Sequence, residues 1–295
     1  MRGLAFCPAH ITGFFKADVE QLEPERMGSL GAGFSIKDGV TTTVVAEKNG
    51  KSDFQIKVSG YKPDNTDVSE FVVKEFQKLV DENYFIEIHH DISVPISYGL
   101  GCSGAVALSL AYALNEALGT KLSKEESGKI AHKAEVSCKT GLGDVIGSFY
   151  GGFEIRTKAG APGIGSIKKF DNHSKVIIAC FSPISTKKFL EDKLDIINGL
   201  GGKMVDKLIQ TNDYNEFQDM SVEFAKYVEV MTPKMDSVIS ELNNIGVRCG
   251  VALFGETVFT LIPEEKEERV LEVLRKYDNN IILQTEIDNI GARLE

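Results

Sequence analysis

The sequence lacks the features that mark secreted, membrane-spanning or metal-caged proteins. Its five cysteines are odd in number and scattered, and none forms a C-x-x-C pair, so we expect reduced thiols. No apolar run reaches the length of about 18 residues that a membrane span needs. The N-terminal residues contain no continuous signal-peptide core. We therefore expect a cytoplasmic protein.

Positive charge is also scarce. The chain has 33 lysines and arginines against 43 aspartates and glutamates, for a net charge of −10. This balance argues against nucleic acid or an anionic membrane as a partner, and it means that an anionic substrate needs a local positive site. At 295 residues, 42% apolar and 26% charged, the chain has the composition of a globular protein with one large domain or two modest ones.

A glycine-rich turn before a long apolar run is the first feature with chemical content. Residues 99–104 read GLGCSG, a G-x-G-x-x-G pattern, but its three common uses need further motifs that are missing here. A dinucleotide fold needs a second strand that ends in an acid, and a protein kinase needs H-R-D and D-F-G. A Walker A loop needs Gly-Lys-Ser/Thr. The sequence therefore excludes all three.

The physical chemistry of this segment still predicts an anion site. Residues 105–118, AVALSLAYALNEAL, are rich in good helix formers and apolar nearly all round, which is typical of a buried helix. The N-terminus of such a helix presents unpaired N–H groups and a partial positive charge to the glycine turn. Phosphate is the natural ligand. The alternative is a tight turn before a core helix.

A second cluster of polar residues follows in residues 132–144, HKAEVSCKTGLGD. Glu135 lies near a predicted helix end, and Asp144 follows a second glycine turn. If this turn faces the first one, both acids meet Ser103 beside the phosphate, where oxygen ligands suit Mg²⁺. The alternative is that Asp144 caps the next helix and that Glu135 is solvated.

The pattern along the chain predicts an α+β protein in two domains, 1–165 and 166–295, divided in a turn-rich segment. In the first domain we expect helices at 68–79, 105–118 and 124–137 and strands at 3–6, 40–46, 54–58, 84–90 and 153–157. In the second domain we expect helices at 186–199, 202–211, 214–230, 233–245 and 264–276 and strands at 175–181, 248–254, 257–262 and 280–286.

These motifs together resemble the GHMP kinases, named for galacto-, homoserine, mevalonate and phosphomevalonate kinases. The stretch from Pro95 to Ala105, P-x-x-x-G-L-G-x-S-x-A, resembles their phosphate loop, and CPAH at 7–10 resembles their first motif. The full pattern is similar to the archaeal-type pantoate kinases over nearly the whole chain. The segments that carry this likeness are CPAHITGFF, GSLGAGFSI, TGLGDVIGSFYGG, IRTKAGAPG and LFGETVF.

The resemblance implies a two-domain GHMP kinase architecture with the active site in the inter-domain cleft. It implies ATP-dependent phosphorylation of pantoate to 4-phosphopantoate, a step towards coenzyme A. Ser103 and Glu135 would ligand Mg²⁺, and Asp144 would take or orient the proton of the reacting hydroxyl. The ATP phosphates would be held by Pro95, Gly99, Leu100, Gly101, Cys102, Ser103, Gly104 and Ala105.

The substrate side needs separate reasoning, because the chain departs from the wider family there. Where the wider family usually has two serines after Gly-Leu-Gly, this chain has Cys102 and then Ser103, so only the second serine is kept. His10 stands where mevalonate kinases carry a lysine. The carboxylate of pantoate calls for an arginine, and we choose Arg156, on a predicted strand just after Asp144. The remaining predicted substrate contacts are Ser29, His132 and His10. The alternatives are a solvent-facing arginine and structural histidines.

Two other functions stay open at this point. Another small-molecule GHMP kinase, acting on mevalonate or a phosphomevalonate, would share the phosphate machinery. A phosphorylated substrate would call for more basic residues near Arg156, and Lys158, Lys168 and Lys169 are available. A nucleotide-binding regulator without activity is disfavoured, because Asp144 is present. We expect ATP and a small hydroxy acid as partners, and a homodimer is compatible with the sequence.

Overall fold

Two long antiparallel strands, β1 (Arg2–Asp18) and β2 (Gly28–Lys48), form the centre of the protein. The computed structural model describes residues 1–50, 52–184, 186–211, 213–278 and 280–295. Within these residues, both strands belong to a seven-stranded sheet of order β11-β1-β2-β4-β3, in which β5 also pairs with β2 and β6 with β5. Its other members are β3 (Asp53–Gly60), β4 (Tyr84–Ile92), β5 (Phe153–Lys158), β6 (Ser166–Phe170) and β11 (Arg293–Leu294).

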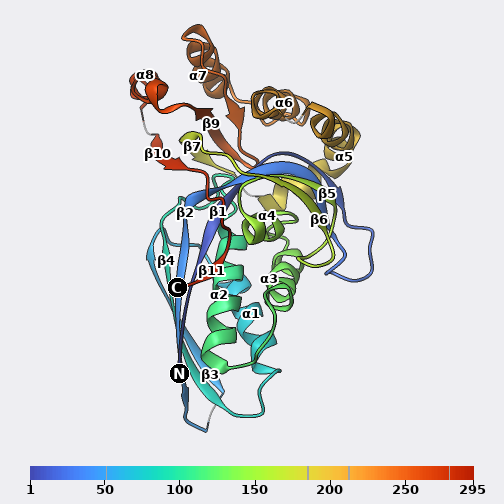
Figure 1. The fold of residues 1–295 in the computed structure, drawn as a ribbon, viewed down its shortest axis with the longest axis vertical. Helices are drawn as coiled ribbons and strands as arrows, with labels where there is room; N and C mark the ends of the chain where they lie inside the picture. The colour runs from blue at the N-terminus through green and yellow to red at the C-terminus, as the bar shows by residue number, and fades with distance from the viewer. Residues whose placement is uncertain (51, 185, 212, 279) are drawn as a thin grey trace.

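Helices cover one face of this first sheet (Figure 1). They are α1 (Asp67–Gln77), α2 (Cys102–Leu118), α3 (Lys124–Cys138) and α4 (Asp144–Tyr150). Helix α2 is buried nearly all round, as its alanine and leucine content predicts. Helix α3 begins at a capping box, in which Ser123 and Glu126 each accept the other's backbone N–H. These local signals explain why the sequence predicted both helices well.

A second sheet lies at the other end of the molecule (Figure 1). Its order is β10-β7-β9-β8, with β7 (Lys175–Pro183), β8 (Gly250–Val251), β9 (Gly255–Ile262) and β10 (Ile281–Glu286). Its helical elements are α5 (Thr186–Thr211), α6 (Tyr214–Tyr227), α7 (Pro233–Asn244), the short η1 (Glu264–Lys266) and α8 (Glu267–Leu274). Among the described residues, no helix combines the length and the apolar character that crossing a membrane requires.

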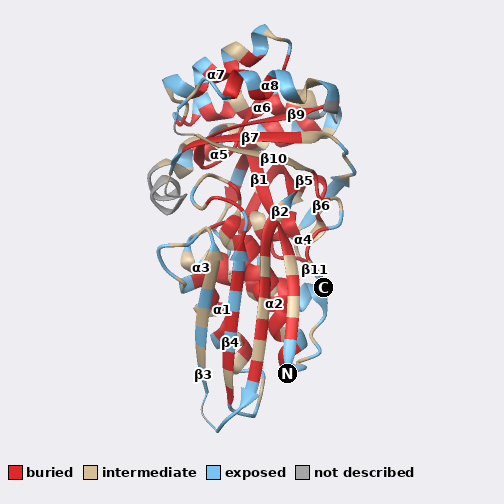
Figure 2. Ribbon diagram, turned by 90° about the vertical axis from the view of Figure 1, so that its left-hand side faces the viewer, coloured by how far each residue is buried: buried red, intermediate tan, exposed pale blue. Residues whose placement is uncertain are grey.

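Aromatic packing joins the two parts. Phe217 of α6 contacts Phe153 on β5 and Phe14 on β1, with ring centroids 5.0 and 5.9 Å apart. It also contacts Phe34 on β2 at 6.2 Å and stacks on Phe259 of the second sheet at 5.9 Å. All five rings are buried, and Figure 2 shows the buried zone running from one part into the other. One continuous core therefore holds both sheets in place around the space between them.

The structure confirms the α+β class and most predicted elements, with these differences. Helix α5 is continuous where two helices, 186–199 and 202–211, were predicted. Strands β1 and β2 are much longer than the predicted 3–6 and 40–46, and the strand predicted at 248–254 is reduced to β8. Helix α4 was not among the expected helices, and strands β6 and β11 were not predicted. Both strands join the first sheet, so the predicted boundary after residue 165 falls within the β5–β6 hairpin.

Candidate active site

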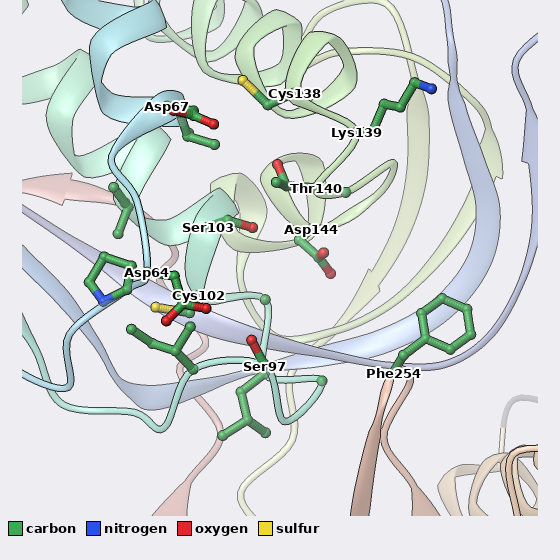
Figure 3. A pocket seen from close by; sticks show the side chains of 18 of the residues that line it. Asp64, Asp67, Ser97, Cys102, Ser103, Cys138, Lys139, Thr140, Asp144 and Phe254 are labelled. Atoms are coloured by element: carbon green, nitrogen blue, oxygen red, sulfur yellow. The ribbon is translucent and has the colours of Figure 1, made fainter. Parts of the chain in front are cut away.

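A cavity of about 580 Å³ lies where the two parts meet. On one side it is lined by the first residues of α1, α2 and α4, and on the other by Pro183, Ile184, Leu253 and Phe254. Figure 3 shows the carboxylate of Asp144 and the hydroxyl of Ser103 turned toward this space, with Phe254 across from them. The predicted phosphate loop and the predicted catalytic acid therefore share one cavity.

The glycine loop forms the cavity wall at the start of α2. Gly101 caps the helix in the left-handed conformation, with φ of 58°, and the carbonyl of Leu100 accepts the backbone N–H of His10. Burial raises the pKa of the Cys102 thiol to about 12, so it stays neutral. The loop residues that line the cavity are Gly99, Leu100, Gly101, Cys102 and Ser103. The other predicted loop residues, Pro95, Gly104 and Ala105, are buried behind them.

Two carboxylates meet beside this loop. Glu135, near the end of α3, is 1% exposed, and Asp144 opens α4 with 21% of its side chain exposed. Gly104 makes this approach possible, because a Cβ there would lie 3.1 Å from Asp144 Cβ and 3.4 Å from Glu135 Oε2. The sequence therefore brings both acids to the N-terminus of α2, as the second glycine turn predicted.

The environment of Glu135 fits a cation. Burial and the charge of Asp144 raise the pKa of Glu135 to about 7, against hydrogen bonds from the hydroxyls of Thr140 and Ser103. Its Oε1 accepts from Thr140, while Oε2 is buried without a hydrogen-bond partner among the described residues. A buried carboxylate oxygen without a partner is costly, and a bound cation would remove that cost.

A buried chain of charged groups holds Asp144 from behind. His10, on β1, lies with Nδ1 3.0 Å from Asp144 Oδ1 and Nε2 3.0 Å from Glu154 Oε1. The guanidinium of Arg156 donates to Glu154 and, at 3.2 Å, to the hydroxyl of Thr12. The side chains of His10, Glu154 and Arg156 are fully buried. Asp144 and Thr12, at the two ends of this chain, both line the cavity.

The four predicted substrate contacts do not all lie at the cavity. Ser29 lines the cavity, whereas His10, His132 and Arg156 lie outside the lining described for it. His132 donates from Nε2 to the carbonyl of Met27 at 2.9 Å, so its ring anchors the segment before Ser29. The rings of His10 and His132 are therefore occupied by protein partners and lie behind the cavity wall.

Arg156 keeps one donor directed at the cavity wall. Its Nε has no hydrogen-bond partner in the described structure. A Cβ on Gly143, which lines the cavity, would lie 2.8 Å from this Nε and 2.5 Å from Ser29 Oγ. The absence of a side chain at Gly143 therefore leaves Ser29 and Arg156 close to the substrate space.

The sequence analysis missed Thr12, Glu154 and Lys139. Lys139 follows α3 in a left-handed conformation, with φ of 57°, and within the described lining it is the only lysine or arginine (Figure 3). Thr12 and Glu154 lie two residues from His10 and Arg156 on their strands. Because side chains two apart on a strand share a face, this spacing is the signal that could have found them.

Comparisons with known proteins agree with this geometry. Residues 68–152 match the family model described as the GHMP kinases N terminal domain, and residues 204–280 match that described as GHMP kinases C terminal. The pantoate kinase of Thermococcus kodakarensis is 31% identical over 276 residues, which cover 92% of this chain and 91% of that protein. The chain belongs to the GHMP kinases.

Further relatives of this GHMP kinase point the same way. The pantoate kinase of Methanocaldococcus jannaschii is 32% identical over 275 residues, which cover 92% of this chain and 96% of that protein. A solved structure described as a phosphotransferase related to the CoA biosynthesis pathway has a TM-score of 0.88. It is 28% identical, and the match covers 100% of this chain and 99% of that one. The protein is a small-molecule kinase with the expected two-part fold.

A glycine pair at the two ends of α2 tests the phosphate loop of the kinase. Gly101 and Gly119 are both left-handed, with φ of 58° and 66°, so alanine strains the backbone by about 1–2 kcal/mol at either site. Only at Gly101 does a Cβ meet neighbours, at 2.7 Å from the carbonyl of His10 and 3.2 Å from Asp144 Cγ. We expect Gly101→Ala to weaken Mg-ATP binding about tenfold or more, because the amides that face phosphate must move.

Gly119→Ala is the matched control, because a Cβ there has no heavy atom within 4 Å. It should lower the melting temperature by the backbone strain alone, less than Gly101→Ala does, and leave nucleotide binding unchanged. Titration of the nucleotide by calorimetry, beside a thermal melt, measures both effects. Equal nucleotide affinity in the two variants would rule out the phosphate loop as assigned.

Proposed function

We propose that this kinase transfers the γ-phosphoryl group of ATP to the terminal hydroxyl of pantoate and forms 4-phosphopantoate for coenzyme A synthesis. The observation that carries the proposal is the likeness to curated pantoate kinases over 92% of the chain. The cavity supports the reaction, because it combines an anion-binding helix N-terminus with a carboxylate. It supports the substrate class, because Ser29 lines the cavity and the unpartnered Nε of Arg156 lies beside Gly143 in the lining.

The phosphate side is built from α2 and α3. Backbone N–H groups at residues 101–103 face the triphosphate, as helix N-termini do at many phosphate sites. Ser103 and Glu135 would hold Mg²⁺, which when bound would supply positive charge to neutralise the phosphates. The described residues contain no cluster of three acids, histidines or cysteines that would form a closed metal site. Two protein ligands plus phosphate oxygens and water is the set that Mg²⁺ usually takes with nucleotides.

Asp144 acts on the substrate hydroxyl. Its Oδ1 is engaged by His10, and its Oδ2 faces the cavity-lining Gly141, where a Cβ would lie 3.0 Å from it. An alcohol is a weak nucleophile at neutral pH, so a carboxylate within hydrogen-bond reach orients it and takes its proton late in the transfer. Oδ2 is the oxygen placed for this role.

The carboxylate of pantoate binds at the wall formed by Ser29, Gly143 and Arg156. The unpartnered Nε of Arg156 and the hydroxyl of Ser29 both lie beside Gly143. A charge-assisted hydrogen bond from the guanidinium would compensate the negative charge of the substrate in this acidic protein. The remaining guanidinium donors stay on Glu154 and Thr12, so the arginine is held in place before substrate arrives.

A panel of acceptors tests the proposal. Purified enzyme is mixed with Mg-ATP and with pantoate, mevalonate, phosphomevalonate or homoserine, and release of ADP is followed. We expect kcat/KM for pantoate to exceed that for each other acceptor by about 10²-fold, because their carboxylates and hydroxyls are spaced differently. Phosphorus NMR should place the new phosphate on the terminal hydroxyl. Faster turnover of mevalonate than of pantoate would reject the assignment.

Three expectations from the sequence remain predictions beside this proposal. They are the use of Mg²⁺, a cytoplasmic location and a homodimer. Sedimentation equilibrium on the purified chain reports the oligomeric state directly. The proposed chemistry needs none of its groups from a second copy, because the phosphate loop, Asp144 and Ser29 line the cavity of one chain, and Arg156 of the same chain lies behind Gly143.

A further inference from the structure

The most unusual buried group in this protein is the imidazole of His10, which lies between two carboxylates. Its Nδ1 is 3.0 Å from Asp144 Oδ1, and its Nε2 is 3.0 Å from Glu154 Oε1. The ring is fully buried, so it does not meet the cavity itself. Of the two carboxylates that it contacts, Asp144 is the one that lines the cavity.

The strand register explains how these groups meet. On β2, Gly33 pairs with Thr12 of β1 on one side and with Glu154 of β5 on the other. Because this central position has no side chain, long side chains from the two flanking strands can reach each other across it. A Cβ on Gly33 would lie 2.7 Å from Nε2 of His10, and one on Gly147 of α4 would overlap the ring. The fold keeps a space that fits this ring closely.

The hydrogen bonds determine the charge of the ring. An ionised carboxylate only accepts hydrogen bonds, so the two carboxylates favour the imidazolium form of His10, in which both nitrogens donate. Burial alone lowers the pKa of His10, but the bonds to Asp144 and Glu154 outweigh it and raise that pKa. The charged groups that face the ring are Asp144 from α4 and Glu154 and Arg156 from β5, while β2 faces it with glycine. Two cations and two anions thus form a chain without net charge, buried except at Asp144.

We propose that His10 is a positioning residue for phosphoryl transfer: it donates to Asp144 Oδ1, is held in turn by Glu154, and keeps Asp144 Oδ2 turned toward the substrate hydroxyl. This inference rests on the proposed function and deepens it. A lone aspartate at a helix start rotates about its side-chain bonds. Here one oxygen is fixed by a buried donor, so the other is presented in one orientation.

A double-mutant cycle between His10 and Asp144 tests this role. In the wild-type background, His10→Gln should lower kcat about 10²-fold, the size expected for a small misplacement of a catalytic group. The KM values for ATP and pantoate should stay within about threefold, because the ring touches neither ligand. In an Asp144→Asn background the same substitution should change kcat by less than about twofold, because the carboxylate that it positions is gone. Losses that multiply in the double variant would overturn the proposal, as would wild-type kcat in His10→Gln.

Glu154→Gln gives a second test that keeps the shape of the chain. Glu154 favours the charged ring, so its neutralisation lowers the pKa of His10. Above that pKa the ring keeps one proton, and the tautomer protonated at Nε2 no longer donates to Asp144. The alkaline limb of the profile of kcat against pH should therefore move down by about one unit or more. An unmoved limb in a folded variant contradicts the proposal even where His10→Gln fails to fold.

Glu256→Gln is the matched control for this second test. Glu256 is also a buried carboxylate, but it accepts from the hydroxyl of Thr232 and lies outside the described lining of the cavity. Its variant should keep the wild-type pH profile. Failure of the proposed function can be told apart from failure of this inference. If the wild-type enzyme does not phosphorylate pantoate, pantoate is rejected as the substrate. The double-mutant cycle is then run with the acceptor that the panel identifies.

Discussion

Replacement of Asp144 by asparagine is expected to lower kcat by about 10²–10⁴-fold, the usual contribution of general acid–base catalysis. Asparagine keeps the size of the side chain and can still accept from Nδ1 of His10, so the orientation of the group is preserved. It removes the charge that receives the proton of the hydroxyl. Mg-ATP affinity should stay close to wild type, because Ser103 and Glu135 are untouched. Single-turnover measurement of phosphoryl transfer isolates this chemical step.

A helix effect must be separated from catalysis in this variant. Asp144 is the first residue of α4, so its charge also interacts favourably with the helix N-terminus, by about 0.3–1 kcal/mol. Asp236→Asn removes an acid from the first turn of α7, in the second part of the protein, and serves as the control. It should cost similar stability and leave kcat unchanged. Near-wild-type kcat in Asp144→Asn would remove Asp144 from the mechanism, whereas an unfolded variant would assign it a structural role at the start of α4.

Local signals made the helices of the first part predictable. The residues of α2 and α3 contain local helix signals. These are helix-forming side chains, a capping box at Ser123 and a left-handed glycine at 119. None of these depends on a distant part of the chain. The glycine loop was predictable for the same reason, because the helix that follows it creates the anion site by itself.

The long strands and the continuous helix α5 could not be predicted from local sequence. The glycines in these elements are required by close contacts with residues that are far away in the sequence. In the sequence, GSLGAG at 28–33 resembles a turn, yet it continues β2, where Gly33 leaves room for His10 of β1. The glycines at 199–202 resemble a helix break. In the structure α5 runs through them, because Gly201 lies against the backbone of Phe15, where a Cβ would overlap it. Tertiary contact overrides the local preference at both places.

In the candidate site too, features set by local sequence were predicted and features set by distant contacts were not. The phosphate loop, Glu135 and Asp144 lie close to one another in sequence and were predicted together. Glu154 and Thr12 were missed because their partners, Arg156 and His10, were considered singly and not as strand pairs. The positions of Arg156 and His132 behind the wall could not be foreseen, because burial depends on which strands and loops pack over them.

Removal of the Arg156 guanidinium should weaken pantoate binding strongly. Loss of the charged partner of a desolvated carboxylate typically costs about 2–5 kcal/mol, so Arg156→Ala should raise the dissociation constant for pantoate by about 30-fold or more. The affinity for ATP should change little, because Arg156 lies beside Ser29 and Gly143 and not at the glycine loop. Calorimetry with a non-hydrolysable ATP analogue present measures pantoate binding apart from any effect on kcat.

Arg156→Ala can also destabilise the fold, because Arg156 neutralises the buried Glu154. Breaking a buried ion pair costs about 3–5 kcal/mol, so Arg156→Lys is the variant that retains charge there. Lysine has no donor equivalent to Nε and cannot form the planar fork, so it should still weaken pantoate binding. Arg293→Lys, at the ion pair with Asp288 in the C-terminal segment, is the control and should bind pantoate normally. Unchanged affinity in a folded Arg156→Lys would place the carboxylate elsewhere, with Ser29 the next residue to test.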